Sequence, residues 1–129
     1  MKLTNDQCKD IVSALKLKDK SPAARISANW NSFGGRIGQY SHEVQYSSAK
    51  KPRKFDMYEL RRKFGDCNII VEIYIPGMRG WNDWIPAKTV YSTDLEDVAK
   101  DCTYDCGVSI NIWKIPATVL KKLEKESQA

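Results

Sequence analysis

The run Cys67–Ile75 constrains the fold of this chain more than any other part of its sequence. Alternate residues from Cys67 onward are apolar, which is typical of one face of a β-strand. Ile70 and Tyr74 make the other face partly apolar as well, and a Pro-Gly pair then ends the run. We therefore expect a central strand of a sheet that is covered on both faces.

Four further segments carry the start signals of helices, three of them capping boxes and one a proline in the first turn. The capping pairs are Thr4 with Gln7, Asp56 with Glu59, and Thr93 with Glu96, and the proline is Pro116. The first helix is expected to end near Leu17. The second should end at Gly65, in the left-handed conformation that glycine favours after a last turn. Residues 127–129 are expected to fray.

Residues 23–47 allow two interpretations. Ile26, Ala28 and Trp30 alternate with polar residues, and the run 39–46 alternates more clearly. A Gly-Gly pair between the two runs signals a hairpin. The alternative is a helix that begins at residues 21–22 and carries Ile26 and Trp30 on one face. We favour the hairpin, because residues 29–34 are rich in asparagine, serine and glycine, which are poor helix formers.

Two more strands are expected at about residues 85–91 and 108–114, after a loop that contains two tryptophans. The order of elements is then α-β-β-α-β-β-α-β-α. This order predicts an α+β fold, with a mostly antiparallel sheet of about five strands and about four helices packed on it. We expect residues 1–129 to form one domain. No apolar run is long enough to cross a bilayer.

The net charge of +5 is concentrated in the N-terminal half and suits a polyanionic partner such as nucleic acid. The densest basic stretch is a predicted loop at residues 47–54, followed by the end of the second helix. In this interpretation the cations hold phosphates while a tyrosine stacks on a base. The candidate nucleic-acid-binding residues are Lys50, Lys51, Arg53, Lys54, Tyr58, Arg62 and Lys63. A solvated surface of mixed charges is the competing interpretation.

Two other features suit a protein partner. The predicted loop after the central strand combines tryptophan with arginine, the residue types that dominate binding hot spots. The competing interpretation packs Trp84 under the sheet. The predicted third helix has an acidic face opposite its apolar stripe, which is also typical of a solvated helix. The candidate protein-binding residues are Arg79, Trp81, Trp84, Asp94, Asp97 and Asp101.

Catalytic chemistry has little support in the sequence. His42 is the only histidine, and its alternation with apolar residues places it on an apolar strand face instead of in a catalytic site. The spacings of a phosphate loop, a nucleophile elbow and a calcium loop are absent. Cys8 and Cys67 are expected to be core thiols. The sequence does not decide whether Cys102 and Cys106 form a disulfide. We expect no enzyme activity, no cofactor and no metal.

The sequence favours a small, basic, non-enzymatic regulatory protein that binds nucleic acid or a nucleoprotein complex through its Lys/Arg patch. The alternative is a protein-binding inhibitor or adaptor that acts through the tryptophan loop or the acidic helix. Phages and other mobile elements encode many small proteins that block larger host complexes, such as defence complexes. The analogy here is one of size and of missing catalytic features. We expect a cytoplasmic, non-membrane protein, because the N-terminus lacks an apolar secretory segment. Sheet edges can pair between copies of a chain, so the sequence does not exclude a homo-oligomer.

Overall fold

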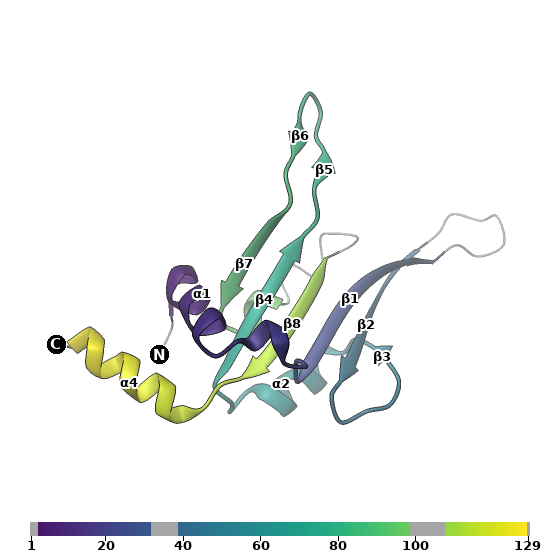
Figure 1. Cartoon of the computed structure of the whole chain (residues 1–129). Helices are drawn as coiled ribbons and strands as arrows, with labels where there is room; N and C mark the ends of the chain where they lie inside the picture. Colours follow the sequence, from purple (N-terminus) through teal and green to yellow (C-terminus); the bar gives the residue numbers. More distant parts are fainter. Residues whose placement is uncertain (1–2, 32–38, 99–107, 129) are drawn as a thin grey trace.

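The computed structural model describes residues 3–31, 39–98 and 108–128 (Figure 1). A six-stranded antiparallel sheet has the order β3-β2-β1-β8-β4-β7, and β5 and β6 form a separate two-stranded ladder. This architecture confirms the predicted α+β class, and the short β3 accounts for the additional strand. The strands are β1 (Ala24–Asn31), β2 (Gln39–Tyr46), β3 (Arg53–Lys54), β4 (Ile69–Ile75), β5 (Met78–Arg79), β6 (Trp84–Ile85), β7 (Lys88–Ser92) and β8 (Ser109–Lys114). The helices are α1 (Asn5–Ala14), the 3₁₀ helix η1 (Leu17–Asp19), α2 (Met57–Phe64) and α4 (Ala117–Gln128). Residues 96–98 are also helical, whereas residues 93–95 of the predicted third helix are not, and its part beyond residue 98 lies outside the described residues.

The segment between α1 and α2 is the predicted hairpin and not the alternative helix. β1 and β2 pair along their whole length, from Ala24 opposite Tyr46 to Asn31 opposite Gln39. Alternation places Ile26 of β1 on the same buried face as its partner on β2, which is the arrangement that the period of two predicts. The Gly-Gly turn lies outside the described residues.

The sheet is covered on both faces, and each face has its own core. On one face Val71 and Ile110 pack in the cluster that includes Leu60 of α2. On the other face Ile70 and Trp113 pack in the cluster formed with α1 and η1. Figure 1 shows α1 in front of the sheet and α2 behind it. β4 contributes to both clusters and pairs with β7 and β8, which confirms the central strand that its sequence predicts.

The first helix begins as predicted but ends earlier. Thr4 accepts a hydrogen bond from the backbone of Gln7, and the Gln7 side chain accepts one from the backbone of Thr4, so the capping box is complete. The helix ends at Ala14 and not near Leu17. Lys16 then adopts a left-handed conformation with φ of 52°, and a 3₁₀ turn follows. This turn redirects the chain so that the Leu17 side chain is buried against the sheet, which explains the early end of the helix.

Replacing Lys16 by glycine is expected to raise the free energy of unfolding by about 0.5–1 kcal/mol. Glycine adopts a left-handed φ without the Cβ clash that costs other residues about 1 kcal/mol. Lys16 is exposed, so the substitution removes no packing. Urea unfolding measures the effect. Lys20→Gly is the control, because Lys20 has an extended φ of −111° and glycine there should lower stability. An Lys16→Gly variant no more stable than the natural protein would contradict the explanation.

The second helix begins and ends differently from the prediction. Asp56 caps it by accepting a hydrogen bond of 3.0 Å from the backbone N–H two residues on. The predicted capping box is not formed, because the Glu59 carboxylate is paired with Arg53 instead. Gly65 has a right-handed φ of −56°, so the predicted left-handed end is wrong. A glycine fits there because a Cβ would lie 2.5 Å from the carbonyl oxygen of Arg61.

Three other boundaries differ from the predicted ones. β4 begins at Ile69, two residues later than expected. The strand predicted at residues 85–91 is divided into β6 and β7, because Pro86 has no N–H to donate to a ladder. α4 extends to Gln128, past the point where fraying was expected.

Candidate functional site

The segment predicted as a tryptophan-containing loop is a projecting β-hairpin. Met78 of β5 pairs with Ile85 of β6 in the register that already joins Ile75 to Lys88 in the β4–β7 ladder. β5 and β6 therefore continue β4 and β7 as one long hairpin. Figure 1 shows its distal half extending beyond the body of the protein. We call residues 76–87 the tryptophan hairpin.

Two local features shape the tryptophan hairpin. Pro76 and Pro86 lie in the break between the two ladders, where each removes a backbone donor. At the far end the Gly80 N–H donates a hydrogen bond of 2.7 Å to the carbonyl oxygen of Asp83. This bond closes a tight turn in which Trp81 is one of the two central residues. The sequence therefore places a tryptophan at the tip of the projecting hairpin.

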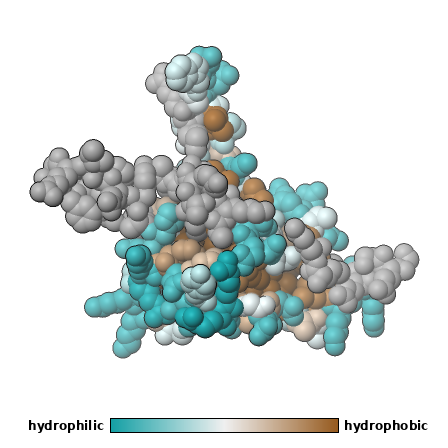
Figure 2. Space-filling view, turned by 180° about the vertical axis from the view of Figure 1, so that it is seen from behind, coloured by the Kyte–Doolittle hydropathy of each residue, from teal (hydrophilic) through white to brown (hydrophobic). Residues whose placement is uncertain are grey.

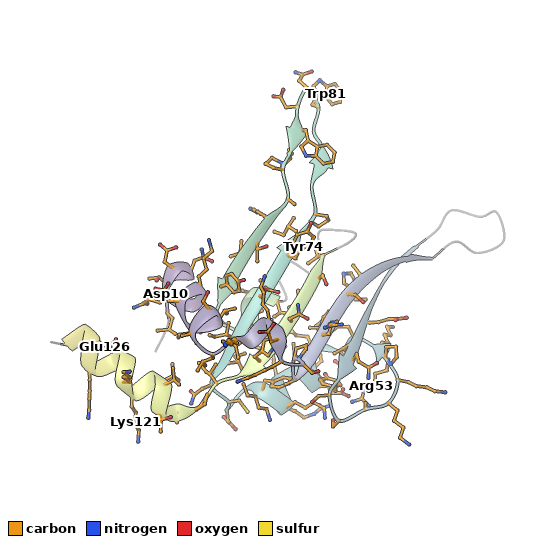
Figure 3. The ribbon with its side chains drawn as sticks, in the orientation of Figure 1. Asp10, Arg53, Tyr74, Trp81, Lys121 and Glu126 are labelled. Atoms are coloured by element: carbon orange, nitrogen blue, oxygen red, sulfur yellow. The ribbon has the colours of Figure 1, made fainter. Side chains whose placement is uncertain are left out.

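Three large apolar side chains of the hairpin are exposed. Trp81 is 99% exposed and Trp84 is 66% exposed, and Ile85 is also exposed. The Trp84 ring lies over Gly77, where a Cβ would come within 2.6 Å of its Cζ2 atom. Figure 3 shows Trp81 at the tip, and Figure 2 shows apolar surface along the stem of the projection. The competing expectation that Trp84 packs under the sheet is therefore wrong. Arg79, the remaining candidate here, lies in β5 and pairs with Trp84.

The candidate nucleic-acid-binding residues are all exposed and come from one end of the sheet. Part of the predicted loop is strand, because Arg53 and Lys54 form β3 and pair with Val44 and Glu43 of β2. We call this region, together with Lys114, the basic surface. Its members are Lys50 and Lys51 before β3, Arg53 and Lys54 in β3, Arg62 and Lys63 in α2, and Lys114 at the end of β8, and Tyr58 lies one turn before Arg62 in α2.

Three cations of the basic surface converge on a pair of stacked rings. Tyr46 and Phe64 have centroids 6.4 Å apart. The Arg53 guanidinium lies 5.1 Å and the Lys63 ammonium 4.7 Å from the Tyr46 centroid. The Lys114 ammonium lies 5.7 Å from the Phe64 centroid. Lys114 was not among the residues predicted from the sequence. The sequence shows it as a cation at the end of the alternating apolar run of the last predicted strand.

Part of this positive charge is neutralised locally. Arg53 forms an ion pair with Glu59, and Arg61 donates two hydrogen bonds of 2.7 Å to the Glu96 carboxylate. The second pair raises the pKa of Arg61 and lowers the pKa of Glu96. Among the described residues no carboxylate pairs with the cations that surround these two arginines. Those cations are Lys50, Lys51, Lys54, Arg62, Lys63 and Lys114.

Tyr46, beneath the cations, is 2% exposed, and no hydrogen-bond partner satisfies its hydroxyl within the described parts of the chain. Burial, with a smaller contribution from Glu59, raises the pKa of Tyr46 from 10.0 to about 12. A raised pKa in the folded state means that folding is favoured while the tyrosine is protonated. This contribution is fully present below about pH 10 and is lost as the pH rises from about 10 to 12.

Tyr46→Phe is therefore expected to lose less stability than the natural protein between pH 9 and pH 11. At pH 7 its free energy of unfolding should be unchanged within about 1 kcal/mol, because no described partner is orphaned. Urea unfolding at several pH values measures both quantities. Tyr58→Phe, at a 71% exposed position, is the control and should keep the natural alkaline loss. Equal alkaline losses in Tyr46→Phe and the natural protein would contradict this assignment.

Two of the three candidate aspartates of the predicted third helix, Asp94 and Asp97, form local hydrogen bonds. Asp94, and not the predicted Thr93, accepts a hydrogen bond of 2.9 Å from the Glu96 backbone. Asp97 accepts one from the Ser92 hydroxyl. Both aspartates are half-buried, and Asp101 lies outside the described residues. The segment therefore offers less exposed charge than its sequence suggests.

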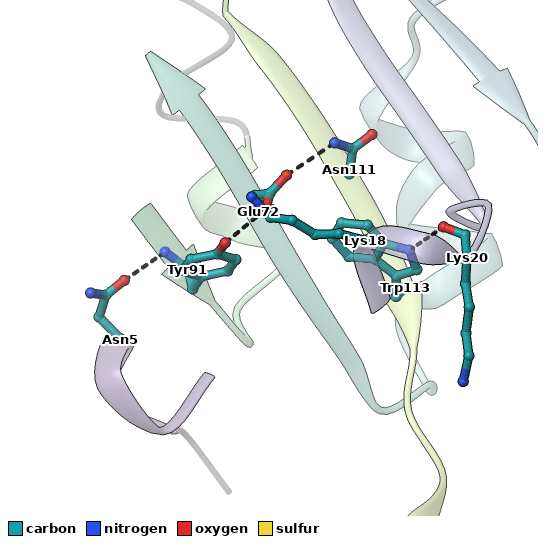
Figure 4. A network of polar contacts seen from close by, with 7 residues as sticks. All are labelled: Asn5, Lys18, Lys20, Glu72, Tyr91, Asn111 and Trp113. Carbon is teal, nitrogen blue, oxygen red and sulfur yellow. Dashed lines mark hydrogen bonds and ion pairs between the residues drawn. The ribbon is translucent and has the colours of Figure 1, made fainter. Parts of the chain in front are cut away.

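A polar network on the α1 face of the sheet was not expected from the sequence (Figure 4). Buried Glu72 accepts hydrogen bonds of 2.8 Å from the Tyr91 hydroxyl and 3.2 Å from the Asn111 amide. The Lys18 ammonium lies 3.2 Å from the same carboxylate, which raises the pKa of Lys18. Each group in the network has a partner within the protein. We therefore interpret the network as structural.

His42 and the described cysteines, Cys8 and Cys67, do not form a set of metal ligands. His42 is half-buried on β2. Cys8 is free and buried, which raises the pKa of its thiol, and Cys67 is free and half-buried. Cys102 and Cys106 lie outside the described residues. In the described ranges no three His, Cys, Asp or Glu side chains are grouped so as to hold a metal ion.

Comparisons with known proteins add no relative: no family model, curated protein or solved structure matches this chain. Across residues 3–31, 39–98 and 108–128, no helix has the length and apolar character that a membrane span requires. The tryptophan hairpin and the basic surface are therefore the candidate functional surfaces.

Proposed function

We propose that this chain is a non-enzymatic binding protein whose tryptophan hairpin docks into a groove of a larger protein or nucleoprotein complex. The observation that carries the proposal is the 99% exposure of Trp81 at the tip of a projecting hairpin. Exposed apolar surface of this kind costs solubility unless a partner covers it. Tryptophan is also the residue type most enriched at binding hot spots.

The geometry of the hairpin suits insertion. Its backbone is fixed at the base by the β4–β7 ladder and at the tip by the Gly80–Asp83 hydrogen bond. A pre-formed hairpin loses little conformational entropy when it binds, so most of the apolar contact contributes to affinity. A protein that occupies the groove of a larger complex in this way acts as an inhibitor or an adaptor. Cys8 and Cys67 are free thiols, which supports a reducing, cytoplasmic compartment.

The test is affinity capture from a lysate of the source cells, followed by mass spectrometry. The natural protein is compared with a Trp81→Ala/Trp84→Ala variant and with Tyr58→Ala. Tyr58 is a matched control, because it is an exposed aromatic residue on α2 and outside the hairpin. A protein retained by the natural chain and by Tyr58→Ala, but absent with the hairpin variant, supports the proposal. Equal recovery of every captured protein with all three baits counts against it.

Nucleic-acid binding by the basic surface is a second candidate function. It is favoured by the convergence of Arg53 and Lys63 on one ring, since the two cations come from different elements and share one small area. Figure 3 places Arg53 and Trp81 at opposite ends of the molecule, so both functions can operate in one protein. Charge reversal of Arg53 and Lys54 together should weaken binding to nucleic acid. Unchanged affinity in that double variant would refute this second function.

A further inference from the structure

We infer that the basic surface binds the phosphate backbone of a duplex and does not stack on unpaired bases. The inference rests on the nucleic-acid function proposed above and names its substrate class. Two observations carry it: the aromatic rings of the region are buried or contacted by an arginine, and three of its cations rest against those rings.

The rings near the basic surface are not available to bases. Tyr46 and Phe64 are buried, and the faces of these rings are approached by Arg53, Lys63 and Lys114. Proteins that bind single strands without sequence preference depend on exposed aromatic platforms, worth about 1–3 kcal/mol per stacked base. Rings covered by protein cations cannot supply that stacking.

Tyr58 is exposed, but an arginine lies over one face of its ring. The Arg61 guanidinium lies 5.7 Å from its ring centroid. Arg61 is itself fixed by two hydrogen bonds of 2.7 Å to Glu96. A base stacking on that face of Tyr58 would have to displace an arginine that has an ion-pair partner. In contrast to the sequence-based prediction, we therefore expect that Tyr58 does not stack on bases.

The cations, in contrast, are pre-organised for a dense row of negative charge. Arg53 is held by both Tyr46 and Glu59, while Lys63 and Lys114 rest on adjacent rings. Exposed Lys50, Lys51, Lys54 and Arg62 lie on the same or adjoining elements. A duplex carries one negative charge per about 1.7 Å of its axis, more than a single strand, and cation contacts to its phosphates carry no sequence information. A compact set of lysines and arginines without free rings therefore favours the duplex.

The experiment measures fluorescence anisotropy with a short labelled DNA duplex and with one of its strands alone, between about 50 and 200 mM salt. The natural protein should bind the duplex about tenfold more tightly than the strand. Its affinity for a second duplex of scrambled sequence should equal its affinity for the first. Lys63→Glu/Lys114→Glu should lower duplex affinity at least about tenfold and reduce the salt slope by about 2. Tyr58→Ala should bind the duplex as the natural protein does. Lys121→Glu/Lys125→Glu, the matched control, makes the same change in net charge on exposed positions of α4 and should bind the duplex no more than about threefold less tightly.

The outcomes separate this inference from the function on which it rests. Tighter binding to the single strand, lost in Tyr58→Ala, would overturn the duplex assignment while the nucleic-acid function survives. Absence of binding to either probe at low salt would end both. An equal loss of affinity in the α4 control would show that net charge, and not this surface, is responsible. Circular dichroism of each variant verifies its fold. The milder double variant Lys63→Gln/Lys114→Gln should also bind the duplex more weakly than the natural protein.

Discussion

Trp81→Ala should weaken binding to the protein partner at least about 30-fold, which corresponds to about 2 kcal/mol. Its free energy of unfolding should stay within about 0.5 kcal/mol of the natural value. Both expectations have one cause. Trp81 is 99% exposed, so its ring contributes nothing to the folded monomer and is available in full to a partner. Titration calorimetry with the captured partner and urea unfolding measure the two quantities.

Tyr58→Ala is again the matched control for Trp81→Ala. Tyr58 is 71% exposed and lies on α2, outside the tryptophan hairpin. Its removal should leave partner affinity within about twofold, since residues at the edge of an interface or outside it contribute little. If Trp81→Ala bound the partner as tightly as the natural protein, the hairpin tip would not be the contact. If it unfolded more easily by more than about 1 kcal/mol, its ring would have a packing role that this structure does not show.

Glu72→Ala should lower the free energy of unfolding by about 2–4 kcal/mol. The substitution leaves the buried Tyr91 hydroxyl and the half-buried Asn111 amide without their acceptor, and an unsatisfied buried group costs about 1–3 kcal/mol. Lys18 is mostly exposed, so the loss of its ion pair adds little. The expected effect is therefore dominated by the two orphaned donors.

Urea unfolding measures the effect of Glu72→Ala. Glu72→Gln should cost less than the alanine variant, because its amide oxygen still accepts one hydrogen bond. Glu126→Ala, at an exposed position of α4, is the control and should stay within about 0.5 kcal/mol. A Glu72→Ala protein as stable as the natural one would show that water satisfies Tyr91 and Asn111 and that the network is dispensable.

Local signals in the sequence predicted part of the local structure, whereas the Asp56–Glu59 capping box and the left-handed Gly65 are not formed. The Thr4–Gln7 capping box and the alternation in β1 and β2 are short-range patterns, and both are present in the fold. Such signals act within a few residues, where the physics of capping and of strand periodicity decides the outcome. The candidate site was also partly predictable, because exposed tryptophans and clustered cations are visible as residue types.

The features that sequence reasoning missed depend on contacts between distant segments. Nothing near Lys114 indicates that its ammonium will lie over Phe64, since strand β8 and helix α2 meet only in the folded sheet. Glu72 stands in the most apolar strand of the chain, and its partners come from β7, β8 and η1. The left-handed turn at Lys16 serves the burial of Leu17, and local propensity gives no warning of it.

The most direct test of the docking proposal is site-specific photo-crosslinking to the captured partner. A benzophenone side chain is placed at Asn82, an exposed turn residue beside Trp81, and in a second variant at Tyr58. The proposal predicts a crosslinked adduct with the partner from position 82 and none from position 58. An adduct from position 58 alone would contradict it and would place the protein contact on the basic surface instead of the tryptophan hairpin.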